Sequence, residues 1–250
     1  MDLTELEDYL NKLLPEEGLT DFSLNGLQIE GKKDVKRIGT AVSASLEAIK
    51  SAVENNIDAL IVHHGLFWNK DSYAITGSKR KKISLLIEHG ISLFAYHLPL
   101  DRHPFLGNNW KAAQDLGLSE LQPFGYMNGI PIGVKGRVPS KGRHELQQML
   151  ETYYQHPAYC AWGGSEKIDT LGIISGGAYK SITEAAELRL DAFITGNFDE
   201  PAWHIAFEEG INFLALGHSA TERVGPKALS KYLQEKLSLH AIFLDFANPF

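Results

Sequence analysis

The segment "RIGTAVSASLEAIKSAVENNIDALIV" (residues 37–62) decides the fold, because the chain repeats it in diverged form as "TLGIISGGAYKSITEAAELRLDAFIT" (residues 170–195). The two segments align at a constant offset of 133 positions, and Asp58 of the first falls on Asp191 of the second. Self-similarity over a distance of this kind is the sequence signature of a repeated structural unit. The chain is therefore expected to contain an internal duplication.

A second match extends the duplication toward the C-terminus of each copy. Residues 88–97 align with residues 208–217 at an offset of 120. The change of offset means that the first copy carries about 13 additional residues, which the polar segment 69–82 can hold.

Each copy shows the same alternation of apolar strands and amphipathic helices. The apolar residues Ile49, Ala52 and Val53 recur with the helical period, whereas the segments on either side are short apolar runs typical of buried strands. Strands that alternate with helices predict a largely parallel sheet covered on its faces. The strands are expected at residues 37–43, 58–63 and 91–96 of the first copy and at residues 169–175, 191–195 and 211–216 of the second.

We therefore predict an α/β fold of two pseudo-symmetric βαβ-type halves, with mixed or mainly parallel sheets flanked by helices. The first half is expected to comprise residues 1–101 and a closing C-terminal segment, residues 218–250. Residues 102–217 are expected to form the second half, and the two halves together form one two-lobed unit.

Composition narrows the class of protein. The chain has 250 residues, a formal net charge of −7 and a single cysteine, Cys160. The acidic balance argues against nucleic-acid binding, and one cysteine excludes both a disulfide framework and a cysteine-rich metal site. The N-terminal segment lacks the pattern of a signal peptide, and no apolar run is long enough to span a bilayer. These features predict a cytoplasmic protein with no membrane association.

Polar side chains follow the predicted strands at the edge where α/β proteins place their functional groups. His63 and His64 end one strand, and the next strand is followed by "HLPLD" (residues 97–101). In the second copy, the strand at 211–216 is followed by "HSATE" (residues 218–222). A single histidine at a strand end is usually a hydrogen-bonded structural residue, but this joint occurrence at equivalent strand ends indicates a site.

The spacing of these residues sets conditions on their geometry. Residues four apart lie on one face of a helix, so His218 and Glu222 could reach one ion. Pro99 disfavours a helix through all of residues 97–101. His63 and His64 would point to opposite faces of an ideal strand, so they can share a site only where the strand ends, and Gly65 permits that turn.

The number and type of these residues predict a metal centre. A single catalytic metal ion takes three or four protein ligands, whereas this set suits two ions, with Asp101 or Glu222 as a bridge. Mixed imidazole and carboxylate ligands favour Zn, Fe, Mn, Ni or Co over Ca or Mg. The full set comprises His63, His64, His97, Asp101, His218 and Glu222.

Several motifs resemble the Nif-three-like family, often called GTP cyclohydrolase I type 2 homologues. They are "NGLQIEG", "DALIVHHGLFW", "AYHLPLD", "GNN", "ISGGA", "TGNFDE" and "ALGHSATE", and the likeness extends from about residue 3 to residue 248. The chain is similar to the short bacterial form of the family, without a long inserted middle domain. The resemblance implies a dinuclear metal site between the halves and a homohexameric ring. The matching ligand positions are His63, His64, Asp101, His218 and Glu222.

Two classes of function fit these expectations. The first is a metal-dependent hydrolase, similar to a cyclohydrolase, that acts on a small molecule, with His97 as a ligand, as a group that supports the ligands or as a catalytic proton carrier. The second is a non-catalytic role as a metal-stabilised ring-shaped scaffold or a ligand sensor. Neither the substrate nor the identity of the two divalent metal ions follows from the sequence.

Overall fold

The chain divides into two compact units in a computed structural model that describes residues 1–16, 18 and 20–250. Unit 1 comprises Met1–Leu100 and Gly225–Phe246, and unit 2 comprises Asp101–Val224 and Ala247–Phe250. The chain passes from unit 1 to unit 2 between Leu100 and Asp101, next to the predicted boundary after residue 101. The chain returns to unit 1 after Val224, so Gly225–Phe246 of the predicted closing segment belongs to unit 1, whereas residues 218–224 belong to unit 2.

Unit 1 contains a mixed sheet with the strand order β1-β4-β3-β2-β11. The strands β4, β3, β2 and β11 run parallel, and β1 is antiparallel to β4 at the edge. The strands are β1 (Gly26–Ile29), β2 (Arg37–Ser43), β3 (Ala59–His64), β4 (Ser92–Ala95) and β11 (His240–Phe243).

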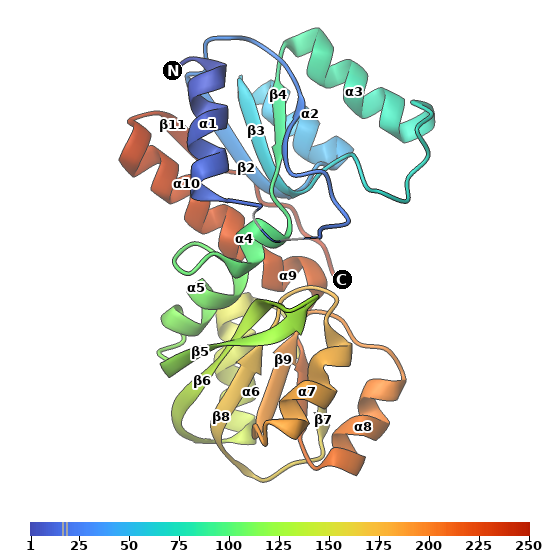
Figure 1. The fold of residues 1–250 in the computed structure, drawn as a ribbon, viewed down its shortest axis with the longest axis vertical. Helices are drawn as coiled ribbons and strands as arrows, with labels where there is room; N and C mark the ends of the chain where they lie inside the picture. Colours follow the sequence, from blue (N-terminus) through green and yellow to red (C-terminus); the bar gives the residue numbers. More distant parts are fainter. Residues whose placement is uncertain (17, 19) are drawn as a thin grey trace. The chain divides into compact units, whose positions relative to one another are not determined.

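Helices cover both faces of this sheet (Figure 1). On one face, the buried residues of two helices pack with the sheet into one apolar core. On the other face, the hydroxyl of Thr40 donates to the carbonyl of Pro226, and Tyr9 bonds to Tyr232 at 3.2 Å between the two remaining helices. The first pair is α2 (Leu46–Glu54) and α3 (Gly77–His89), and the second pair is α1 (Leu3–Leu13) and α10 (Val224–Leu237).

Unit 2 contains a second mixed sheet, with the strand order β5-β6-β8-β9-β10-β7. The central strands β8, β9 and β10 are parallel, whereas β5, β6 and β7 pair antiparallel with their neighbours. The strands are β5 (Ser119–Met127), β6 (Ile130–Gly142), β7 (Tyr159–Trp162), β8 (Lys167–Ile173), β9 (Ala192–Thr195) and β10 (Asn212–Ala215).

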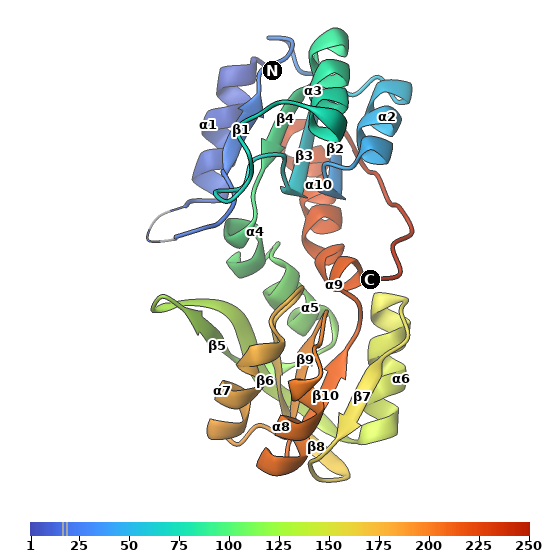
Figure 2. The ribbon, with the colours of Figure 1, turned by 90° about the vertical axis from the view of Figure 1, so that its right-hand side faces the viewer.

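Figure 2 shows α6 on one side of this sheet and α7 and α8 on the other. The apolar residues of α5 and α6 join the sheet in one core. The helices are α5 (Asn108–Asp115), α6 (Arg143–Tyr154), α7 (Ile182–Glu187), α8 (Pro201–Glu209) and α9 (His218–Glu222), with a 3₁₀ turn at Tyr179–Ser181. The predicted α/β class, with mixed sheets flanked by helices, is confirmed.

The aligned residues Asp58 and Asp191 make equivalent hydrogen bonds in the two units. Asp58 Oδ2 accepts hydrogen bonds from the backbone amides of Lys36 and Arg37, each at 3.0 Å. Asp191 Oδ2 accepts from the amides of residues 169 and 170, at 3.0 and 2.9 Å, which are the aligned positions. Each aspartate precedes the second strand of its copy and holds the start of the first, so the sequence match reflects an equivalent local structure.

The segment after β4 is more helical than Pro99 suggests. The helix α4 (Leu98–Arg102) begins immediately after His97, with Pro99 as its second residue. Proline is tolerated in the first turn of a helix, where its missing N–H would have no partner within the helix. The helix therefore includes Asp101 but not His97.

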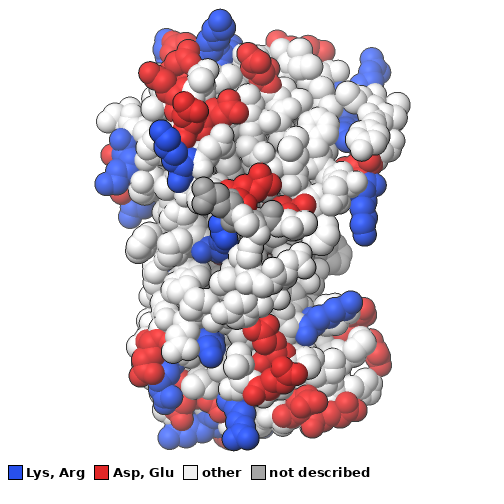
Figure 3. Space-filling model, viewed as in Figure 1, with Lys and Arg blue, Asp and Glu red and all other residues white. Residues whose placement is uncertain are grey.

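The surface carries charges of both signs. In Figure 3, the basic and acidic side chains are interspersed over the face that is drawn. Within the described chain, no helix combines the length and the apolar character needed to cross a bilayer.

Candidate metal centre

The histidines at the strand ends of unit 1 converge. His63 and His64 are the last residues of β3, and His97 follows β4, the parallel neighbour of β3. The ring centroids lie 4.6 Å apart for His63 and His64, and 5.0 Å apart for His63 and His97. One ring nitrogen of each residue lies within 4.8 Å of the other two. We call these residues the histidine cluster.

The protein holds the Nδ1 atoms of the two adjacent histidines. Nδ1 of His63 lies 3.1 Å from the backbone carbonyl oxygen of Tyr96, which can only accept a hydrogen bond, so this nitrogen carries the proton. Nδ1 of His64 lies 3.0 Å from the hydroxyl of Ser43, its register partner on β2. With Nδ1 engaged, Nε2 is the nitrogen with which each ring would bind a metal ion.

His97 is held in the same way by a carboxylate that the sequence analysis missed. Its Nδ1 lies 2.7 Å from Oδ1 of Asp21, whose side chain is fully buried. Asn25 and the backbone amide of Leu98 each donate to Oδ2 of Asp21 at 3.0 Å. Burial alone would raise the pKa of Asp21, but the hydrogen bond and charge of His97, the side chain of Asn25 and the backbone of Ser23 together lower that pKa below its usual range.

The contact between a carboxylate and a histidine is a common support for a metal ligand. A carboxylate on the outer nitrogen fixes the ring orientation and the tautomer, and it makes the inner nitrogen a stronger donor. Asp21 therefore fixes the orientation of His97 and the proton on its Nδ1, so Nε2 is the nitrogen that could bind a metal ion or accept a proton.

Replacing Asp21 with asparagine is expected to weaken metal binding by the histidine cluster by about 10- to 100-fold. The amide of asparagine can donate to Nδ1 of His97, which would move the ring proton to Nε2 and block that nitrogen as a ligand. Affinity is measured by competition with a coloured chelator for Zn²⁺ or Co²⁺. The control is Asp71→Asn, at an exposed carboxylate of the same unit. An unchanged affinity in Asp21→Asn would contradict this role.

Gly65 and Trp68 shape the surroundings of the histidine cluster. Gly65 does not have a positive φ. A Cβ atom at this position would instead lie 2.7 Å from Cβ of Ala95 and would collide with the side chain of Gln28, so the glycine is needed for space. The ring of Trp68 lies 5.1 Å from that of His97 and packs beside the cluster. The sequence predicts that Gly65 permits a turn at the strand end, whereas the structure requires a glycine at this position for close packing.

In unit 2, Asp101 is buried and held by polar side chains. Its Oδ1 accepts hydrogen bonds from Nδ2 of Asn108 at 2.8 Å and from the hydroxyl of Ser175 at 3.1 Å. Asn109 supports the same region, because its Oδ1 accepts from the backbone amide of Ser175 and its Nδ2 donates to the carbonyl of Ile132. The "GNN" motif therefore positions a carboxylate, and Ser175 acts as one of its donors.

His218 and Glu222 lie at opposite ends of α9, and the predicted i, i+4 relationship brings them together. His218 Nε2 lies 3.2 Å from Oε1 of Glu222, which is only 3% exposed. A carboxylate oxygen of Glu222 also lies within 4.8 Å of one of Asp101. We call Asp101, His218 and Glu222 the acidic group.

The glycine turn of "ISGGA" packs directly against the acidic group. Gly176 has a φ of +67°, and a Cβ atom there would lie 3.2 Å from Nε2 of His218 and would collide with the carboxylate of Glu222. The amide of Gly176 donates to the hydroxyl of Thr221 at 3.0 Å. The turn thus allows a close approach of backbone to side chain. Asn197, in the loop after β9, is exposed.

The structure therefore brings the predicted site residues together as a histidine cluster in unit 1 and an acidic group in unit 2. Sequence reasoning found these residues from their positions after strands. It missed Asp21, Asn25, Ser43 and Asn108, which hold them in place.

Comparison with known proteins places these motifs in a wider group. The family model described as Duf34/NIF3 (NGG1p interacting factor 3) matches residues 1–249. A protein of Chlamydia muridarum (strain MoPn / Nigg), named GTP cyclohydrolase 1 type 2 homolog, is 49% identical over the whole of both chains. The matches to two solved structures also extend over the whole of this chain and the whole of the other protein. Protein ybgI, of unknown function, is 38% identical with a TM-score of 0.94, and TTHA1606 from Thermus thermophilus is 34% identical with a TM-score of 0.92.

Proposed function

This chain belongs to the Duf34/NIF3 family, and from that premise we propose that it is a metal-dependent hydrolase with a dinuclear metal centre. The observation that carries the proposal is that the protein orients all three rings of the histidine cluster through contacts at Nδ1. Nδ1 of each ring is engaged by the protein, so each ring offers Nε2 as a donor.

The residues fit divalent metal ions by the chemistry of their donors. Imidazole nitrogens and carboxylate oxygens together suit Zn, Fe, Mn, Ni or Co. The donors of both groups exceed what a single tetrahedral ion takes, which supports two ions. The residues that would hold them are His63, His64, Asp101, His218 and Glu222, with His97 beside them.

Two such ions would supply an activated water and a Lewis acid that polarises the bond under attack. His97 is the residue that we assign to proton transfer, since Asp21 holds the proton on Nδ1 and steadies the ring while Nε2 takes or gives a proton. The same Nε2 would serve if His97 is a ligand instead.

The relatives' name suggests a purine nucleotide ring as substrate, and the donor set equally suits hydrolysis of another cyclic amide, an amidine or a phosphoester. The test is a screen of GTP and such compounds with protein loaded separately with each of the five metals. We expect turnover that stops on chelation and returns when the metal is restored. A screen in which every metal-loaded sample is inactive would contradict a hydrolase.

The resemblance to this family also leads us to propose a homohexameric ring, and the same samples test it by light scattering. A ring that keeps its mass after chelation while activity is lost supports the hydrolase. A ring that disperses on chelation, with no reaction found, supports the alternative of a metal-stabilised scaffold or ligand sensor.

A further inference from the structure

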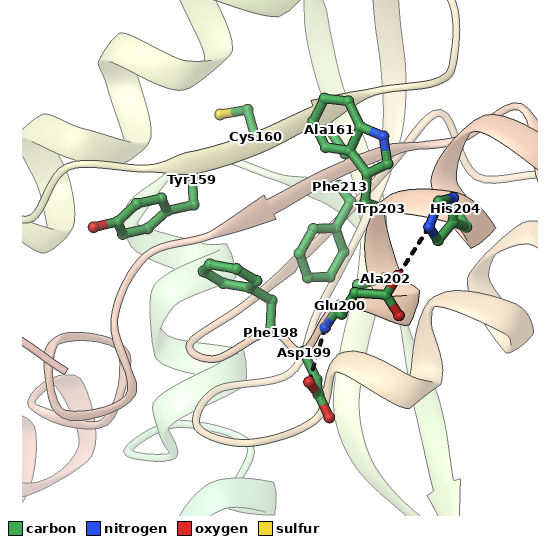
Figure 4. Close-up of a pocket in the computed structure, with 10 residues that line it drawn as sticks. All are labelled: Tyr159, Cys160, Ala161, Phe198, Asp199, Glu200, Ala202, Trp203, His204 and Phe213. Carbon is green, nitrogen blue, oxygen red and sulfur yellow. Dashed lines mark hydrogen bonds and ion pairs between the residues drawn. The ribbon is translucent and has the colours of Figure 1, made fainter.

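Unit 2 contains an apolar pocket lined by residues outside the candidate metal centre (Figure 4). Its volume is about 320 Å³, within the range of small-molecule sites. The edge strand β7, the loop after β9, the helix α8 and the strand β10 form its walls. The lining residues are Tyr159, Cys160, Ala161, Phe198, Asp199, Glu200, Ala202, Trp203, His204 and Phe213.

The loop in this pocket is the segment "GNFDE" (residues 196–200), which follows β9 and whose first two residues align with His63 and His64 at the end of β3 in the other copy. Phe198, Asp199 and Glu200 line the pocket, and none of them belongs to the acidic group. This strand end therefore builds a different site from its counterpart.

Aromatic rings dominate the surface of the pocket. Tyr159, Phe198 and Trp203 are 60%, 51% and 55% exposed, whereas Phe213 is buried. The rings of Tyr159 and Phe198 have centroids 5.2 Å apart. Large exposed aromatic side chains gathered around one hollow mark a binding surface.

The charges at the pocket favour a cation. Among the described residues that line it, there is no lysine or arginine, and His204 is bonded to Glu200 at 2.9 Å. Figure 4 shows Glu200 turned toward His204 and the carboxylate of Asp199 pointing away from the rings. Both carboxylates therefore contribute a negative electrostatic potential without contacting the ligand directly. The faces of the aromatic rings, which also carry partial negative charge, would form the direct contacts with a bound cation.

We propose that this pocket binds a methylated ammonium group. A primary ammonium needs a direct hydrogen-bond acceptor for each N–H, and the carboxylates here are engaged elsewhere. A quaternary ammonium has no N–H to satisfy, and aromatic faces are the surfaces that recognise it. The group could belong to a free small molecule or to a methylated lysine side chain, which share this chemistry.

The test compares choline with its uncharged carbon isostere, 3,3-dimethylbutan-1-ol, by tryptophan fluorescence and NMR titration of the full-length protein. Choline is expected to bind saturably and at least about tenfold more tightly than the isostere. Trp203→Ala and, separately, Phe198→Ala should each weaken choline binding by about tenfold. Tyr126→Ala is the control, since this exposed aromatic residue of unit 2 lies on β5 and does not line the pocket.

A second arm identifies the source of the group with peptides that contain trimethyl-lysine or unmodified lysine. Binding of the trimethylated peptide at least tenfold tighter than choline assigns the pocket to a modified protein, and weaker peptide binding assigns it to a small molecule. Equal affinity for choline and its isostere, or no saturable binding of either, overturns the proposal. A change of oligomeric mass in Trp203→Ala, with no binding of choline to the unaltered protein, would make the pocket an interface between copies.

Discussion

Replacing His64 with alanine is expected to abolish metal-dependent turnover and to weaken metal binding by the histidine cluster by more than about 100-fold, beyond the cost of losing a supporting group. The variant removes one Nε2 donor and leaves those of His63 and His97. His64 is half-buried, whereas His63 is fully buried, so His64→Ala separates the loss of a ligand from the cost of a core cavity. Elemental analysis after dialysis, together with turnover, measures both effects.

His89→Ala is the matched control for this variant. His89 is an exposed histidine at the end of α3 in the same unit, outside the histidine cluster. It should keep the metal content and the turnover of the unaltered protein. Retention of both in His64→Ala would show that the histidine cluster does not bind the metal.

The internal duplication could be predicted because its matched residues have local roles. Asp58 and Asp191 each hold two backbone amides next to their own strand, so their spacing to the strands is preserved along the chain. A contact between neighbouring segments leaves a pattern of this kind in the sequence. The strands and helices of each copy could therefore be placed without knowledge of their neighbours.

The contact between Asp21 and His97 could not be predicted, because it depends on the pairing of strands that are distant in the sequence. Asp21 comes to His97 because β1 is antiparallel to β4, with Gly26 opposite Ala95. The residues that precede β1 therefore lie where β4 ends. No local pattern identifies β4 as the neighbour of β1, so the sequence offers Asp21 only as one carboxylate among many.

The two copies also show why position at a strand end is not enough to assign a role. The ends of β3 and β9 are equivalent in the duplication, yet β3 ends in His63 and His64, whereas β9 is followed by exposed residues that line an aromatic pocket. Unit 2 places His218 after β10 instead. The shared scaffold therefore predicts where side chains gather, and only their chemistry distinguishes a metal ligand from a pocket wall.

Replacing Gly176 with alanine is expected to destabilise the protein by several kcal/mol and to disturb the acidic group. A φ of +67° costs a non-glycine residue about 1–2 kcal/mol, and forcing an extra methyl group into a packed site costs about 1–3 kcal/mol more. The methyl group would collide with the carboxylate of Glu222. That carboxylate is buried and lies 3.2 Å from Nε2 of His218, so it cannot move without breaking this contact.

Gly177→Ala is the control that separates this clash from a general effect of changing the glycine turn. A Cβ atom at Gly177 would lie 3.6 Å from Cε1 of His218, which is an ordinary contact, and its φ is not positive. This change should alter stability by no more than about 0.5 kcal/mol. Urea unfolding measures stability, and elemental analysis measures bound metal. Equal stability and equal metal content in the two variants would mean that the contact between Gly176 and Glu222 does not shape the acidic group. Loss of both in Gly176→Ala alone would show that the turn after β8 sets the position of Glu222.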